Sequence, residues 1–325
     1  MPRKKQLAQL PIQIYNLGSA AGSTLSFSRE ELWARMDASM GAKAVSTPVF
    51  LVNEAQMDKI YPPKRRRALD PKKVRARIRD WGEKKIREIE DLLKELDNMN
   101  DWEQYEEIVA VGVYVSDHRS YYATQVVNLG DKEYRSEDAE EAFLNLGETT
   151  QPTPAIFLCP ERIVNWAKRE GIPVELVLDK VYYHELGHAI MDVGDTPYDT
   201  SWGRTIEESL ANWIAYSKFK GSDVRLIQHL IETQPAEYKG YAWLENAFIG
   251  LFFESQNFPI REWIDFIWHL RCSFLPWPFL WVTAKEPTLE KLVMESWIES
   301  KRRQYWSEDV EKAWQEFAVR LLERV

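Results

Sequence analysis

The sequence predicts an α+β protein. A small antiparallel or mixed β-sheet subdomain would lie over a helix that carries an HExxH motif, with a larger all-helical C-terminal subdomain after it. Three observations support this class: residues 105–160 hold short apolar, β-branched segments between turn residues, residues 173–193 form one uninterrupted apolar helix pattern, and residues 221–325 show repeated helix starts and stops.

Length and charge suggest two regions. A chain of 325 residues commonly forms two domains, and we expect a basic, mostly helical region over residues 1–100 and a second domain over residues 101–325. The first region carries 20 Lys and Arg against 13 Asp and Glu, so its net charge is +7, whereas the rest of the chain has a net charge of −16.

The overall composition is that of a globular protein in water, with 45% hydrophobic and 29% charged residues. No apolar run reaches membrane-spanning length, and the basic start MPRKK is not followed by the apolar region of a signal peptide. We therefore expect a cytoplasmic protein without a membrane partner. Its two cysteines, Cys159 and Cys272, are expected to be buried thiols.

The first helix is expected near Ser28, which forms a capping-box pattern with Glu31, and it should extend to about Ser39. The segments on either side look irregular. A second helix should begin at Asp70-Pro71, which suit an N-cap and a first helical turn, and continue to about Asp97.

A basic segment, residues 64–87, covers the start of this second helix. Cations there oppose the helix macrodipole, so a nucleic-acid backbone or an acidic partner is one interpretation of the segment. The other is a solvated helix face whose later acidic residues balance the charge. The second is preferred because charge runs alone are weak evidence.

The β-rich part follows over residues 105–160. Residues 108–116 (IVAVGVYVS) and 121–128 (YYATQVVN) predict a hairpin around the turn 117–120, and residues 155–159 (AIFLC) predict a third strand. Between them, residues 136–147 fit a short helix. A further helix should extend from Pro160 to Glu170 and stop at Gly171.

The HELGH motif lies in the next helix, which starts near Pro173 and is expected to end before Gly194. Positions i and i+4 share a helix face, so His184 and His188 can direct imidazole nitrogens at one metal ion. Glu185 would flank that ion and accept a proton from a water that zinc makes acidic. Because the helix is apolar on two sides, it should be buried, and a metal offsets the cost of burying these polar groups. Hydrogen-bonded core histidines are the alternative.

A catalytic zinc needs a third protein ligand and an open fourth position. The next helix, TIEESLANWIAYSKF from Thr205, resembles the gluzincin class of zinc metallopeptidases, in which a glutamate follows HExxH on the next helix. A similar E-x-x-A-N segment follows HELGH in metallopeptidases that cleave bacterial repressors. The resemblance covers residues 155–220.

The resemblance implies that Glu208 is the third ligand, with Glu207 as the alternative, and that Asn212 orients a zinc-binding histidine by hydrogen bonding. One observation argues against Glu208 as the ligand. Thr205 and Glu208 also fit a capping box, which would give Glu208 a structural role. The class also implies that an edge strand beside the HExxH helix receives peptide substrate, here residues 155–159 or one hairpin strand.

Oxyanion stabilisation would require a further group. Tyr198 and His269 lie at chain distances similar to those of the tyrosine and histidine in thermolysin-like enzymes, and Tyr241 and His229 are further candidates. The sequence thus predicts a zinc-dependent peptidase that acts on a peptide or protein substrate. The alternative is a metal-containing regulatory or interaction protein that uses the basic segment to bind nucleic acid or a partner.

The region after residue 221 should be almost entirely helical. A short helix is expected to start at Asp223. Longer helices are expected over residues 235–255, 259–272 and 287–301, and from 307 to the end. Eleven of the fourteen tryptophans lie from Trp166 onward, so aromatic side chains should dominate burial there. The segment LPWPFLW, residues 275–281, could line a substrate cleft or contact a partner, but an aromatic, proline-kinked connection within the core is the preferred interpretation.

Overall fold

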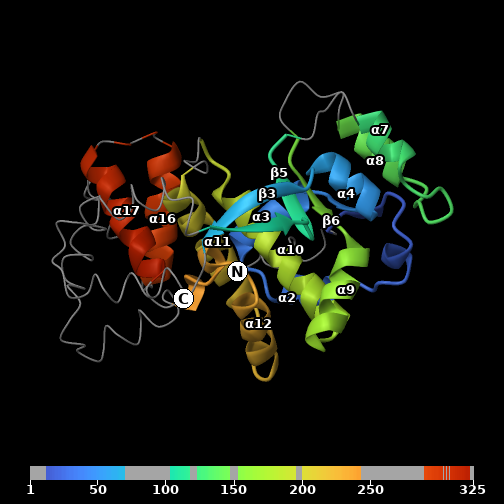
Figure 1. The fold of residues 1–325 in the computed structure, drawn as a ribbon. Coiled ribbons are helices and arrows are strands. Elements are labelled where there is room, and N and C mark those ends of the chain that lie inside the picture. The colour runs from blue at the N-terminus through green and yellow to red at the C-terminus, as the bar shows by residue number, and fades with distance from the viewer. Residues whose placement is uncertain are drawn as a thin grey trace. The chain divides into compact units, whose positions relative to one another are not determined.

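The computed structural model describes residues 12–69, 103–117, 123–146, 153–194, 200–242, 289–302, 304, 306 and 308–322 (Figure 1). The chain forms two compact units, each made of three separate stretches of the sequence. The first comprises residues 1–67, 105–190 and 214–233, and the second comprises residues 68–104, 191–213 and 234–325. These units differ from the expected division at residue 100, because strands near the N-terminus pair with a strand from the middle of the chain.

A four-stranded mixed sheet forms the centre of the first unit. Its order is β1 (Ile14–Asn16), β2 (Val49–Leu51), β6 (Ala155–Leu158) and β5 (Gly112–Val115). The first three strands are parallel, and β5 is antiparallel to β6 with Val113 opposite Phe157. The expected α+β class with a small mixed sheet is confirmed, and the third predicted strand corresponds to β6.

The predicted hairpin is wrong. Residues 112–115 do form β5, but Ala123–Asn128 form a helix, α7, instead of the second strand. Val126 and Val127 of α7 are buried in the same core cluster as the sheet residue Phe157. β-branched residues favour strands only weakly, and here burial against a sheet overrides that preference.

The segments expected to be irregular around the first helix are also structured. They hold β1, β2, α3 (Ala38–Ser46) and α4 (Glu54–Ile60). The first helix, α2 (Arg29–Ala34), begins as predicted, because Glu31 N donates to Ser28 Oγ at 3.4 Å, but it ends before Ser39. A new N-cap, Asp37, then starts α3 by accepting a hydrogen bond from Met40 N at 2.9 Å.

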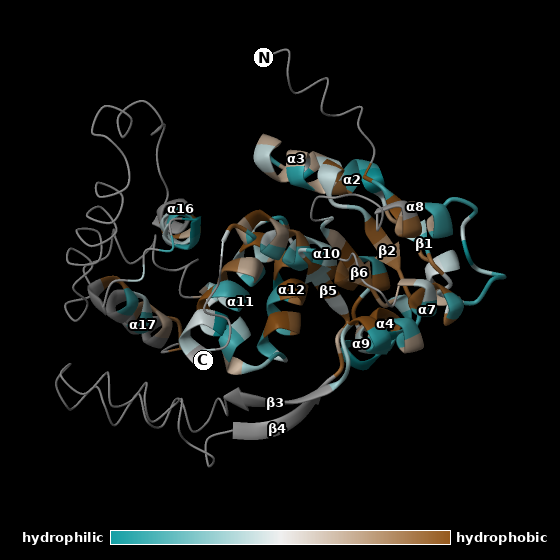
Figure 2. Cartoon of the chain, turned by 90° about the horizontal axis from the view of Figure 1, so that it is seen from above, coloured by the Kyte–Doolittle hydropathy of each residue, from teal (hydrophilic) through white to brown (hydrophobic). Residues whose placement is uncertain are grey.

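The two faces of the sheet pack against different helices. Val113 and Val115 point to the cluster built by α4, α7 and α8 (Ala139–Leu146). Side chains alternate along a strand, so Gly112 faces the opposite side, where its backbone approaches Val181 of α10 (Val174–Met191). In Figure 2 the inner strands β2 and β6 are brown, as expected for strands covered on both faces.

Helix boundaries near α10 follow the expected stops. Helix α9 covers Pro160–Glu170 and ends at Gly171, which adopts a left-handed φ of 67°. Helix α10 ends three residues before Gly194, which is also left-handed. Beyond it come α11 (Ser201–Tyr216) and α12 (Asp223–Glu232), with the latter starting at the predicted residue.

The second unit has an aromatic helical core. Helices α16 (Leu289–Arg302) and α17 (Glu308–Leu322) match two of the predicted C-terminal helices, and η3 (Ala236–Tyr238) precedes them. Trp297 makes edge contacts with Trp202 and Trp314, at centroid distances of 6.3 and 5.0 Å. The helix expected at 259–272 and the segment 275–281 lie outside the described residues.

The basic residues Lys64–Arg67 lie in a strand. They begin β3 (Lys64–Leu69), which pairs with β4 (Glu103–Ile108) in a two-stranded sheet. The sequence of β4, EQYEEI, contains three glutamates. The predicted helix 70–97, which holds residues 70–87 of the basic segment, lies outside the described residues. Among the helices that the structure describes, none is both long and apolar enough to cross a lipid bilayer.

Candidate metal centre

Helix α10 is buried over most of its length. Every residue from Leu176 to Gly187 is buried, which confirms the expectation from its apolar pattern. His184 and Glu185 are 6% and 7% exposed, and His188 is half-buried. Such a helix provides a rigid support that fixes the relative positions of the three motif side chains.

The two histidines direct the same ring nitrogen at one another. Their Nε2 atoms are 3.2 Å apart, and the rings are nearly perpendicular, at 87°. Two nitrogens bound about 2.0–2.1 Å from one tetrahedral zinc ion are about 3.3 Å apart. The histidine pair therefore already has the spacing of two ligands of one metal ion.

Glu208 supplies a third donor atom. Single ligand atoms of His184, His188 and Glu208 all lie within 4.8 Å of one another. Glu208 is 2% exposed, and a buried carboxylate is stabilised by a nearby cation. Two imidazoles and one carboxylate form a donor set that suits zinc, and a tetrahedral ion bound by these three residues would take a fourth ligand from outside this group.

The neighbouring Glu207 is directed at other groups. Its Oε1 atom accepts hydrogen bonds from Trp297 Nε1 at 2.9 Å and from Lys301 Nζ at 2.5 Å. Both glutamates fit the sequence spacing expected of a third metal ligand. In the structure Glu207 accepts these two hydrogen bonds, whereas Glu208 lies near the two histidines. Lys301 and Trp297 could not have been identified from sequence, because they lie about ninety positions downstream in no recognisable motif.

The capping box expected at Thr205 is wrong. Helix α11 begins at Ser201, so Thr205 and Glu208 lie inside it. The hydroxyl of Thr200 accepts a hydrogen bond from Gly203 N at 3.1 Å, which is the arrangement of an N-cap. Glu208 therefore has no capping role that competes with metal binding.

Asn212 has partners that the sequence did not indicate. Its Nδ2 donates to Gln234 Oε1 at 3.1 Å and to the carbonyl of Tyr238 at 3.0 Å. Its buried Oδ1 receives no hydrogen bond within the described parts of the chain. The expected orientation of a histidine by Asn212 stays a prediction, and Oδ1 is the atom that would accept from the ring.

The edge strand β5 lies against Glu185. An ideal Cβ built at Gly112 would be 3.0 Å from Glu185 Oε1 and 2.6 Å from Val181 Cγ1, so a larger residue there would require these side chains to shift. Tyr114, two residues later, shares the face of Gly112. A glycine inside a β-branched strand signals close backbone approach, and this signal was available in the sequence. Strand β6, the other candidate edge strand, is internal to the sheet.

Two of the four oxyanion candidates lie within the described residues, and both are away from the HELGH helix in the sequence. Tyr198 and His269 lie outside the described residues. His229 is on α12, where its Nε2 lies 3.2 Å from Glu170 Oε2 and its side chain is more than half exposed. Tyr241 is buried in the second unit.

Burial also shifts the pKa of two groups in the first unit. It raises the pKa of Asp179 on α10 to about 6, against the opposing effect of Arg35 at 3.1 Å. It raises the pKa of the Cys159 thiol to about 12, which agrees with the expected buried thiol. Cys272 lies outside the described residues.

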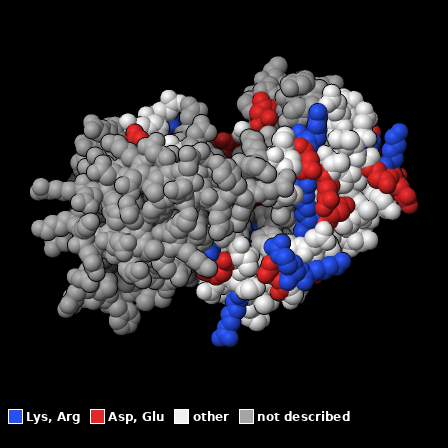
Figure 3. Space-filling view, viewed as in Figure 1, with Lys and Arg blue, Asp and Glu red and all other residues white. Residues whose placement is uncertain are grey.

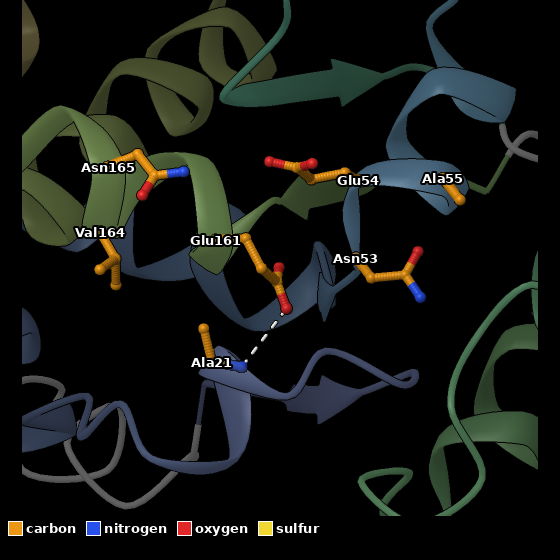
Figure 4. Close-up of a pocket in the computed structure, with 7 residues that line it drawn as sticks. All are labelled: Ala21, Asn53, Glu54, Ala55, Glu161, Val164 and Asn165. Atoms are coloured by element: carbon orange, nitrogen blue, oxygen red, sulfur yellow. Dashed lines mark hydrogen bonds between the residues drawn. The ribbon is translucent and has the colours of Figure 1, made fainter.

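A shallow cleft of about 520 Å³ lies elsewhere in the first unit (Figure 4). It is found where β2 and β6 lead into α4 and α9, and none of its lining residues belongs to α10 or α11. Glu161 in this cleft already accepts hydrogen bonds from Ser19 Oγ at 2.9 Å and Ala21 N at 3.3 Å. These contacts anchor the loop after β1. On the face shown in Figure 3, the described acidic and basic side chains are interleaved.

Comparison of the chain with protein-family models, curated proteins and solved structures finds no match. The functional argument therefore depends on the residues of the centre itself.

Proposed function

We propose that this protein is a zinc-dependent peptidase of the gluzincin type, with His184, His188 and Glu208 as the metal ligands. The observation that carries the proposal is the 3.2 Å spacing of the two histidine nitrogens, with the Glu208 carboxylate within 4.8 Å. When bound, zinc lowers the pKa of water towards neutrality and polarises a carbonyl oxygen.

Glu185 would act as the general base. It follows His184 directly and its carboxylate is held between α10 and the backbone of Gly112. The carboxylate would accept a proton from the attacking water and pass it to the amine released from the peptide bond. This proton transfer requires a carboxylate beside the metal that is not itself a ligand.

Strand β5 provides a place for a peptide substrate. It is the last strand of the sheet, and Gly112 places it directly beside Glu185. An extended peptide that added to this edge would bring its own backbone close to the general base. We therefore propose that the substrate is an extended segment of a peptide or protein.

The test is the variant Glu185→Gln, measured for bound zinc and for cleavage of a mixture of unstructured peptides read by mass spectrometry. The variant should keep about one zinc per chain and lose at least about a hundredfold in activity, because an amide cannot accept the proton. The control is Glu175→Gln, at an exposed position in the first turn of the same helix.

Loss of zinc together with activity would show that Glu185 is a metal ligand, which contradicts its proposed role as the general base. Unchanged activity in Glu185→Gln, or no cleavage by the zinc-loaded wild type, would contradict the proposed peptidase.

A further inference from the structure

The Glu207 carboxylate is held by a buried pair of donors from α16. Lys301 and Trp297 both donate to its Oε1 atom, and the side chains of Lys301 and Glu207 are only 2% and 4% exposed. The two donors are four residues apart, so they project from one face of α16. Edge contacts of Trp297 with Trp202 and Trp314 keep this face in the aromatic core.

Lys301 also binds the end of α10. Its Nζ donates to the carbonyl oxygen of Met191, the last residue of α10, at 2.6 Å. The last carbonyls of a helix have no partner within the helix and form the negative end of its dipole, so a cation is favourable there. One ammonium group thus joins the end of the HELGH helix to Glu207 on α11.

Gly194, three residues after the end of α10, lets the chain pass close to the end of α16. Gly194 has a left-handed φ of 71°, and a Cβ there would collide with the carbonyl oxygen of Lys301. Both the backbone conformation and the close approach require glycine at this position. The end of α16 is therefore fitted closely to the segment that leaves α10.

Stability alone does not explain a buried ion pair, because the cost of desolvating two charges offsets most of their attraction. The ion pair also has a geometric effect, because it fixes the rotation of α11 about its own axis. Successive residues of a helix are about 100° apart, so binding Glu207 to α16 turns Glu208 away from α16. His188 precedes Met191 by three residues, so the same ammonium group also fixes the end of α10 close to the histidines.

We propose that Lys301 is a positioning residue for the metal centre, which sets the rotation of α11 that presents Glu208, and not Glu207, to His184 and His188. The inference rests on the proposed function, because it assumes that these three residues bind zinc.

The test compares the wild type with Lys301→Met and with the double variant Glu207→Gln/Lys301→Met. The double variant removes both buried charges, so its melting temperature without metal should return towards that of the wild type. Its zinc affinity, measured by competition with a chromophoric chelator, should remain about tenfold or more below the wild type. Its Co²⁺ absorption spectrum, which reports ligand geometry, should also differ from the wild-type spectrum.

The matched control is Arg302→Met. Arg302 is the next residue of α16 and pairs at the surface with Glu299, at 2.7 Å. Its loss should leave zinc affinity and the Co²⁺ spectrum unchanged.

A double variant with wild-type affinity and spectrum would overturn the positioning role and leave the metal centre intact. A wild type that binds neither zinc nor Co²⁺ would overturn the proposed metal centre and this inference with it.

Discussion

The backbone of Gly112 approaches Glu185 so closely that an added Cβ would lie 3.0 Å from the carboxylate oxygen Oε1. The edge of the sheet and the proposed general base are therefore in direct contact within the first unit. A side chain added at Gly112 would therefore require Val181 or Glu185 to move.

Gly112→Ala should reduce peptidase activity while zinc stays stoichiometric. The new methyl group would press on Val181 and displace the Glu185 carboxylate, and a displacement of about 1 Å costs up to about a hundredfold in rate. Activity and bound zinc should be measured on the same preparation.

The control is Val115→Ala, on the opposite face of β5. It should lower the melting temperature with little effect on activity per folded molecule. Wild-type activity in Gly112→Ala would show that the carboxylate position is not critical.

Glu208→Gln and Glu207→Gln should have different effects. Glu208→Gln should weaken zinc binding by about two orders of magnitude or more, because it removes a charged ligand. Glu207→Gln should still reach one zinc per chain at saturation, but it leaves the buried Lys301 without its carboxylate and should lower the free energy of unfolding by about 3–5 kcal/mol.

Zinc titration and chemical denaturation of the metal-free proteins separate these two effects. The reverse pattern, with zinc lost only in Glu207→Gln, would make Glu207 the ligand.

Asp179 should make the metal-free protein less stable as pH rises. Its folded pKa of about 6 lies above the value of about 3.9 for an unfolded chain, so the folded state binds the extra proton between these values. The stabilisation is complete below the unfolded pKa and is lost as pH rises through about 6. The stabilisation is on the order of 3 kcal/mol for a pKa raised from about 3.9 to about 6.

Denaturant unfolding from pH 4 to pH 7 should show this loss in the wild type and not in Asp179→Asn. Arg35→Gln should move the loss to higher pH, because Arg35 opposes the rise in the Asp179 pKa. Parallel curves for the wild type and Asp179→Asn would exclude this effect.

The wild type should show no binding to duplex or single-stranded oligonucleotides at low ionic strength. The first four residues of the basic segment lie in β3, which pairs with a strand whose sequence contains three glutamates, and charge runs alone are weak evidence for a nucleic-acid site. Electrophoretic or fluorescence titrations at several salt concentrations would measure any binding.

Binding that weakens steeply with salt would contradict this expectation. A smaller salt slope after replacement of Arg65, Arg66, Arg67, Lys72 and Lys73 by Gln would then identify the phosphate-binding residues. That result would favour the alternative function as a nucleic-acid-binding regulator.

The sequence by itself determined the features that depend on local periodicity. The i, i+4 spacing of His184 and His188 places both rings on one side of a helix, and the apolar residues around them required that helix to be buried. The stop at Gly171 was equally local, because a left-handed residue there suits glycine.

The tertiary structure decided what depends on contacts between distant segments. Residues 123–128 form a helix whose apolar side chains are buried against the sheet. Strands β1 and β2 lie in one sheet with β6, which follows them by more than a hundred residues. The distinction between Glu207 and Glu208 is one residue of helix rotation, about 100°, for which the sequence offered only the E-x-x-A-N resemblance as a guide. In our proposal Lys301, far along the chain, sets this rotation through its buried contact with Glu207, because the rotation of a helix is set by what each of its faces packs against.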